Sequence, residues 1–208
     1  MDSIQVMNSL QVTRTRTRLL VSRLFALGIL SLLVLGSSYW SSVPLVGQTL
    51  FLIGVLLAVL GFCGRLWCLS YIAGRKKKAL VTVGPYSMCR HPLYFFSLVG
   101  GIGLGLCTET LTAALLFVLA FVVYYPHIIR TEERFLSENF SEYSVYKGRV
   151  PLFFPRWSSF TDGNVSVNAT ALRGEIMEGG GFLCCIGLFE FIECLHLTEI
   201  LPTYFLLP

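Results

Sequence analysis

The sequence predicts an all-α fold: a polytopic integral membrane helical bundle with four transmembrane helices and a fifth, carboxyl-terminal apolar helix. Hydrophobic residues make up 54% of the 208 residues and charged residues only 13%, against roughly 25% charged in a typical soluble domain. The mean hydropathy is +0.70. A soluble surface would have to expose large apolar patches, which soluble monomers rarely do. The composition therefore disfavours a soluble enzyme, a disordered chain and a protein whose partner is nucleic acid, and it predicts a chain whose partner is the lipid bilayer.

Apolar runs predict the helices in chain order. Residues 24–38 follow a basic start but lack a small-residue cleavage site, so we expect a retained first helix rather than a signal peptide. Residues 43–62 are long enough to cross a hydrocarbon core of about 30 Å, and the helix is expected to continue to residue 74. Residues 93–107 and 111–129 predict the third and fourth spans. The last apolar run, 181–201, contains acidic residues and a histidine, and either spans the membrane or lies in its interface.

The polar segments predict the orientation and the domain boundaries. All 16 basic residues fall in segments 1–23, 65–92 and 130–180, with four, six and six respectively. The positive-inside rule then predicts a cytoplasmic amino terminus. The host membrane would be the inner membrane in a prokaryote and the endoplasmic reticulum in a eukaryote. The expected organisation is a basic cytoplasmic segment (1–23), a membrane core (24–156), a polar linker (157–180) and a carboxyl-terminal apolar helix (181–208).

Two glycine- or acid-rich patterns have structural interpretations that we favour over functional ones. Gly100 to Gly105 lacks the spacing of a dinucleotide loop and follows no predicted strand, so it predicts close helix packing. The pattern Glu190-x-x-Glu-x-x-His-x-x-Glu199 resembles half of a di-iron site. Such a site needs a second Glu-x-x-His, which the sequence lacks, so an amphipathic helix or one lining a cavity is favoured. We expect no metal ligands.

A first polar cluster precedes the third span, in residues 83–94 (VGPYSMCRHPLY). Gly84 and Pro85 predict a turn, and Pro92 suits the first position of a helix. Arg90 and His91 would then lie at the amino end of that helix, where unpaired backbone donors favour an anionic group. The alternative is that both side chains are interfacial anchors that reach toward headgroups.

A second cluster follows the fourth span, in residues 130–151 (RTEERFLSENFSEYSVYKGRVP). Arg130, Glu132 and Glu133 would lie at or just beyond the membrane boundary, where ionisable groups tend to face the protein interior or a polar cavity. A solvated amphipathic helix is the alternative interpretation of this cluster.

Taken together, the order R-H-P-x-Y, a span, R-x-E-E and then E-Y-x-x-Y-K-x-R-V-P resembles the isoprenylcysteine carboxyl methyltransferase and phospholipid N-methyltransferase group. The resemblance covers residues 80–155. It implies a helical membrane fold, S-adenosylmethionine bound on the cytoplasmic side, and methyl transfer to a lipophilic or small acceptor: an isoprenylcysteine-like carboxylate, a phospholipid amine or a thiol.

The residues fit that chemistry. The cationic sulfonium of S-adenosylmethionine is favoured by carboxylates such as Glu132 and by the aromatic faces of Tyr86 and Tyr94. Arg90 or His91 could receive its carboxylate. For the acceptor, Arg130 could orient a carboxylate, or Glu133 could take the proton of an amine or thiol. Direct methyl transfer needs positioning and no metal.

The alternative function is a non-catalytic or metal- or haem-binding membrane protein on a similar scaffold. Haem ligation would need two of His91, His127 and His196. We expect His91 and His127 near the same membrane face, which leaves no good axial pair.

Overall fold

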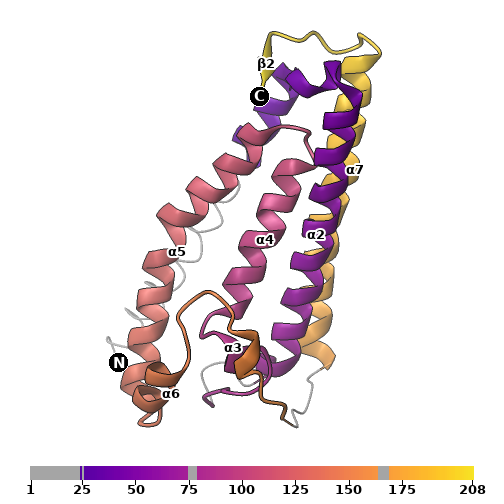
Figure 1. Ribbon diagram of the computed structural model, residues 1–208. Coiled ribbons are helices and arrows are strands. Elements are labelled where there is room, and N and C mark those ends of the chain that lie inside the picture. Colours follow the sequence, from indigo (N-terminus) through magenta and orange to yellow (C-terminus); the bar gives the residue numbers. More distant parts are fainter. Residues whose placement is uncertain (1–23, 25, 75–78, 164–168) are drawn as a thin grey trace, which may run out of the picture.

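The computed structural model describes residue 24 and residues 26–74, 79–163 and 169–208. The basic segment 1–23 and the lysine run 76–78 lie outside the described residues. The elements follow in this order: an apolar helix Ala26–Leu35, β1 (Gly36–Ser38), the short 3-10 helix η1 (Tyr39–Ser42), α2 (Pro44–Ile72), α3 (Pro85–Met88), α4 (Pro92–Leu106), α5 (Leu111–Asn139), α6 (Tyr143–Arg149), the 3-10 turn η2 (Trp157–Ser159), α7 (Ala169–Leu197) and β2 (Phe205–Leu207). Figure 1 shows the long helices lying side by side, with α3 and α6 at one end and β2 at the other.

Helices α2 and α4 pack so closely that their backbones are in contact. A Cβ atom added to Gly61 of α2 would lie 2.5 Å from the Cα of Gly100 in α4, and one added to Gly103 would lie 2.3 Å from the backbone nitrogen of Ala58. Only small residues allow such an approach. The predicted packing role of the glycines between 100 and 105 is confirmed.

Within the part of the chain that the structure describes, two helices, α2 and α5, are long and apolar enough to cross a membrane, whereas Ala26–Leu35 and α4 are shorter apolar helices. At 15 residues, α4 extends about 22 Å, less than a hydrocarbon core of about 30 Å. Large apolar side chains of α2 and α5 face outward, including Leu45, Leu56 and Val123. The structure thus agrees with an all-α membrane protein, while the number of four spans stays a prediction.

The boundaries drawn around the last helix were wrong. Helix α7 begins at Ala169, inside the expected linker 157–180. The polar stretch that begins the helix contains Ala, Leu, Arg, Glu and Met, which are strong helix formers, so its polarity misled the interpretation. The helix ends at Leu197 rather than continuing to residue 208, because Pro202 interrupts the chain and β2 then pairs in parallel with β1.

Candidate functional site

The site lies where the start of α4 meets the end of α5, at the α3 and α6 end of the molecule (Figure 1). Gly84 has a φ of +62°, which favours glycine. A Cβ atom there would lie 2.3 Å from the ring of Tyr71. Pro85 and Pro92 open α3 and α4 at positions where the missing N–H costs no helix hydrogen bond. These turns hold Arg90 and His91 at the entrance of α4.

Arg90 and Glu133 form the central ion pair of the site. The guanidinium of Arg90 donates a hydrogen bond to Oε1 of Glu133, and the two side chains are only 11% and 16% exposed. Nζ of Lys147, on α6, lies 3.6 Å from Oε2 of the same carboxylate. Both oxygens of Glu133 are therefore engaged by cations.

Glu132 faces a different set of partners, because adjacent residues of a helix point about 100° apart. The hydroxyl of Tyr94 donates a hydrogen bond of 2.8 Å to Oε2 of Glu132, and Nδ1 of His91 lies 3.7 Å from that oxygen. The rings of His91 and Tyr94 are stacked, with centroids 5.7 Å apart. The imidazole of His91 lies between the two glutamates, because its Nε2 is 3.5 Å from Oε1 of Glu133. The other partners differ: Tyr94 contacts Glu132, whereas Arg90 and Lys147 contact Glu133.

Several buried polar atoms of this cluster lack partners. Nε of Arg90 has no hydrogen-bond partner within the described part of the chain. Nε2 of His91 and the hydroxyl of Tyr143 make no hydrogen bond of good geometry there either, although Nε2 lies 3.5 Å from Oε1 of Glu133 and the phenol lies close to Arg90 and Glu133. Buried polar groups are normally hydrogen-bonded, so these atoms are available to a ligand that enters the site. Burial lowers the pKa of His91, although both glutamates oppose that shift, and burial raises the pKa of Tyr143 to about 12. At neutral pH the imidazole is therefore neutral, and the phenol keeps its proton.

A cavity of about 190 Å³ opens beside this cluster. Apolar residues from the end of α2 form one wall, among them Leu69 and Ile72. The polar wall consists of Tyr86, Arg90, His91, Tyr94 and Glu132. A cavity with a carboxylate, two phenol rings and unpartnered cationic and imidazole nitrogens fits a ligand that carries both a cation and an anion.

The structure brings six of the seven candidate residues together. Tyr86, Arg90, His91, Tyr94 and Glu132 line the cavity, and Glu133 lies against Arg90. Arg130 is exposed and lines neither described cavity. Its role as an orienting group stays a prediction.

Sequence reasoning missed two residues, Tyr143 and Lys147, although both belong to the motif quoted above. Tyr143 is 1% exposed, and its hydroxyl interacts with Arg90 and Glu133. The signal was the spacing: Tyr143 lies ten residues after Glu133, far enough for α6 to fold back beneath the end of α5.

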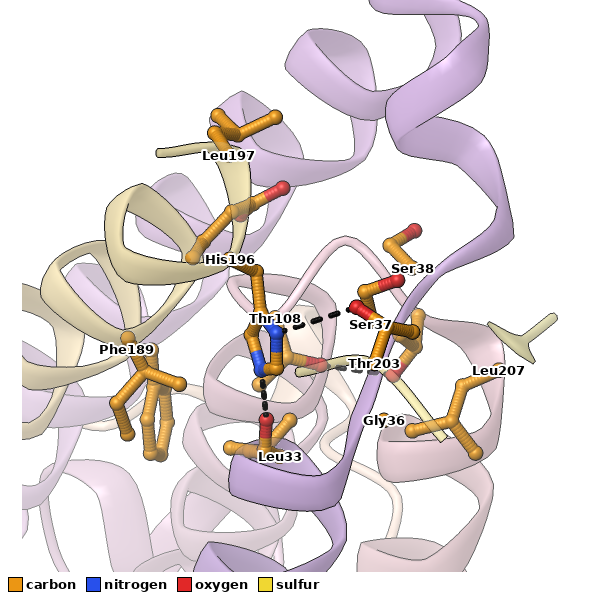
Figure 2. A pocket seen from close by; sticks show the side chains of 13 residues that line it. Leu33, Gly36, Ser37, Ser38, Thr108, Phe189, His196, Leu197, Thr203 and Leu207 are labelled. Carbon is orange, nitrogen blue, oxygen red and sulfur yellow. Dashed lines mark hydrogen bonds between the residues drawn. The ribbon is translucent and has the colours of Figure 1, made fainter. Parts of the chain in front are cut away.

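A second cavity, of about 140 Å³, lies at the opposite end of the molecule, between α7 and the β1 and β2 strands (Figure 2). His196 projects into it from α7, and its Nε2 lies 3.0 Å from the carbonyl oxygen of Leu33, while Nδ1 lies 3.3 Å from the hydroxyl of Thr203. The acid- and histidine-containing pattern of α7 therefore lines a cavity, but not the one beside Arg90. Among the described residues, no group of three or more His, Cys, Asp or Glu side chains could hold a metal ion.

Residues 38–143, which include α2, α4 and nearly all of the cluster, match the phospholipid methyltransferase family. The chain belongs to this family.

Three relatives show where the chain lies within that group. It is 40% identical over 195 residues to a nickel-cobalt-cadmium resistance protein of Alcaligenes xylosoxydans xylosoxydans, covering 93% of this chain and 91% of the relative. It is 40% identical over 183 residues to a cobalt-zinc-cadmium resistance protein of Cupriavidus metallidurans, covering 88% and 84%. Identity is 32% over 114 residues to the protein-S-isoprenylcysteine O-methyltransferase of Saccharomyces cerevisiae, covering 50% and 48%. No solved structure matches the chain.

Proposed function

We propose that the protein transfers a methyl group from S-adenosylmethionine to a lipophilic or small acceptor at the cytoplasmic face of its membrane. The observation that carries the proposal is that one cavity is lined by Tyr86, Arg90, His91, Tyr94 and Glu132, with Glu133 paired to Arg90 behind it, in a chain of the phospholipid methyltransferase family. The chemistry of the cavity supports the proposal, because one wall holds both a carboxylate with aromatic rings, which suit a cation, and unpartnered nitrogen atoms, which suit an anion.

The cofactor supplies a methyl group on a positively charged sulfur. Glu132 and the ring of Tyr94 would hold the cationic part, because a carboxylate and an aromatic face both attract a cation. Nε–H of Arg90 would donate to the carboxylate of the amino-acid end, and Nε2 of the neutral His91 would do so in the tautomer that carries its proton there. The apolar wall of Leu69 and Ile72 would exclude water, which is what a positioned direct transfer requires.

Glu133 has a second possible role besides accepting a proton. Since both of its oxygens are engaged by Arg90 and Lys147, the carboxylate would chiefly hold Arg90 in place. An acceptor amine or thiol would then lose its proton to Glu132 or to solvent. A carboxylate acceptor has no proton to lose and would need a cation, for which exposed Arg130 is the candidate.

The test is binding and transfer with the purified protein. S-adenosylmethionine should bind the detergent-solubilised chain in a calorimetric titration. Membrane extracts incubated with the protein and methyl-labelled cofactor should yield a labelled lipid-soluble or small product, which chromatography identifies. A folded protein that binds no cofactor would refute the proposal, as would stoichiometric haem or metal in the purified chain without any transfer.

A second proposal concerns the cellular role. The 40% identity to two proteins named for resistance to nickel, cobalt, zinc or cadmium favours a part in metal tolerance. With no cluster of three potential ligands among the described residues, we propose that such a role acts through the methylated product rather than through metal bound by this chain. A strain that lacks the protein should then regain more tolerance with the wild-type chain than with Glu132→Gln. Equal rescue by both chains would refute this link.

A further inference from the structure

The segment Leu152 to Phe160, here called the interfacial segment, exposes large apolar side chains although it lies outside the long helices. The exposed fractions are 42% for Leu152, 75% for Phe154, 66% for Trp157 and 46% for Phe160. Figure 1 shows the coil between α6 and α7 rising along α5 before it returns to α3. Such side chains need a partner other than water.

The segment is fixed to the rest of the protein rather than loosely attached. The backbone N–H of Arg90 donates to the carbonyl of Pro151, and the N–H of Arg156 donates to that of Met88, at 2.9 and 3.0 Å. Between these bonds residues 152–154 form a bend. Phe153 is half-buried and packs against other rings, whereas Leu152 and Phe154 are exposed.

The contacts of Phe153 show where the segment lies along α5. Its ring centroid lies 5.9 Å from that of Phe95 and 5.6 Å from that of Phe121. Phe121 precedes Glu133 by 12 residues, or about 18 Å of helix, and Val123 beside it is 81% exposed on the apolar face of α5. At this depth Phe153 is covered by α4 and α5. The hydrogen bond from Arg156 to Met88 of α3 brings Trp157 and Phe160 back to the site end of the protein, where they can meet the headgroup layer.

The chemistry of the segment fits the headgroup layer rather than the hydrocarbon core. Within the described residues, the backbone groups from Leu152 to Pro155 make no backbone hydrogen bond, and a lipid core does not tolerate unpaired backbone. Between residues 145 and 160 the charged side chains are Lys147, Arg149 and Arg156. All three are basic and exposed. Exposed Phe and Trp beside arginine are typical of segments that lie at a membrane interface.

We propose that the interfacial segment inserts into the headgroup layer at the candidate-site end of the protein, and that Arg149 and Arg156 bind the phosphates of anionic lipids there. This inference concerns lipid binding and does not depend on methyl transfer. A docking surface for a soluble protein would need no apolar side chains at the depth of a membrane-crossing helix. The occupant is therefore an anionic lipid surface.

The experiment uses the full chain in bilayers of phosphatidylcholine and phosphatidylglycerol, with bromine on the acyl chains of either lipid as the fluorescence quencher. Subtracting the emission of Trp157→Phe from that of the wild type gives the emission of Trp157. The same subtraction with Trp67→Phe gives the emission of Trp67, which is the control. Trp67 packs between Phe96 and Phe160, with ring centroids 6.4 and 6.1 Å away. We expect brominated lipid to quench Trp157 strongly and Trp67 weakly. Trp157 emission that is quenched no more than that of Trp67 would overturn the insertion.

The lipid preference is tested on the same signal. Brominated phosphatidylglycerol should compete for the segment up to about 30-fold better than brominated phosphatidylcholine, if each arginine contributes its usual attraction to an anionic surface. Arg149→Gln combined with Arg156→Gln should abolish the preference. Arg134→Gln combined with Arg173→Gln removes the same charge from exposed positions elsewhere. This variant should keep the lipid preference. Equal competition by the two lipids in the wild-type chain, or equal loss in both double variants, would overturn the proposed phosphate contacts.

Discussion

Replacing Glu132 by glutamine should weaken the binding of S-adenosylmethionine without disturbing the fold. The amide oxygen of glutamine can still accept the 2.8 Å hydrogen bond from Tyr94, so only the negative charge is lost. A hydrogen bond to a charged group contributes about 1.5–3 kcal/mol. Because the Glu132 side chain is 31% exposed, we discount this to about 1–2 kcal/mol, or about 5- to 30-fold in the dissociation constant.

The assay is a calorimetric titration of the cofactor into the detergent-solubilised chain. Glu138→Gln is the matched control, since it makes the same change at an exposed position one to two turns further along α5. That variant should bind like the wild type. Equal affinity of the Glu132 variant and the wild type would refute the argument, because the cavity carboxylate would then contribute nothing to binding.

Three further predictions concern stability. Glu133→Gln leaves a buried arginine without its carboxylate and should lower the free energy of unfolding by about 2–4 kcal/mol, less than a fully buried pair because both side chains retain some solvent contact; an unchanged denaturation midpoint would contradict this. Gly61→Ala should cost about 1–3 kcal/mol by forcing α2 from α4, whereas Gly187→Ala, which meets nothing within 4 Å, should not destabilise the protein. Burial lowers the pKa of His91 below 6.5, so between pH 6.5 and the folded pKa the unfolded chain binds a proton that the folded chain does not. Stability should therefore fall as the pH drops from 6.5 through the folded pKa. Thermal unfolding across that range should depend less on pH in His91→Gln than in the wild type, and parallel curves would refute the argument.

The sequence could predict the helices because apolar runs and proline positions are local signals. Pro92 opens α4 and the polar step after Leu106 ends it, within one residue of the expected bounds. The extent of α7 could not be predicted in this way, because a helix that continues beyond its apolar part leaves only a weak propensity signal. The pairing of β2 with β1 joins residues about 170 positions apart, and nothing local in either three-residue strand indicates it.

The sequence could predict which residues meet at the candidate site, but not which contacts each of them makes. Helices α4 and α5 form a hairpin, which returns the chain to the membrane face where α4 begins. The predicted spans alone therefore place residues 90–94 near residues 130–133. The division of work between the adjacent glutamates depends on which way each faces, and a shift of one residue turns a helical side chain by about 100°. Only the structure shows Glu133 turned toward Arg90 and Lys147, and Glu132 toward Tyr94 and the cavity.

This division determines the charge that a ligand would meet. Arg90 and Glu133 largely neutralise each other, and Lys147, with a side chain that is 52% exposed, adds only a weak surface pair. His91 is neutral at ordinary pH because burial lowers its pKa. Among the residues that the structure describes, Glu132 therefore remains as the carboxylate of the cavity wall that no cation balances at short range, and it lies beside the ring of Tyr94. A cavity with that residual charge favours a ligand whose reacting end is cationic, which is why the substitution at Glu132, rather than the one at Glu133, tests the cofactor proposal most directly.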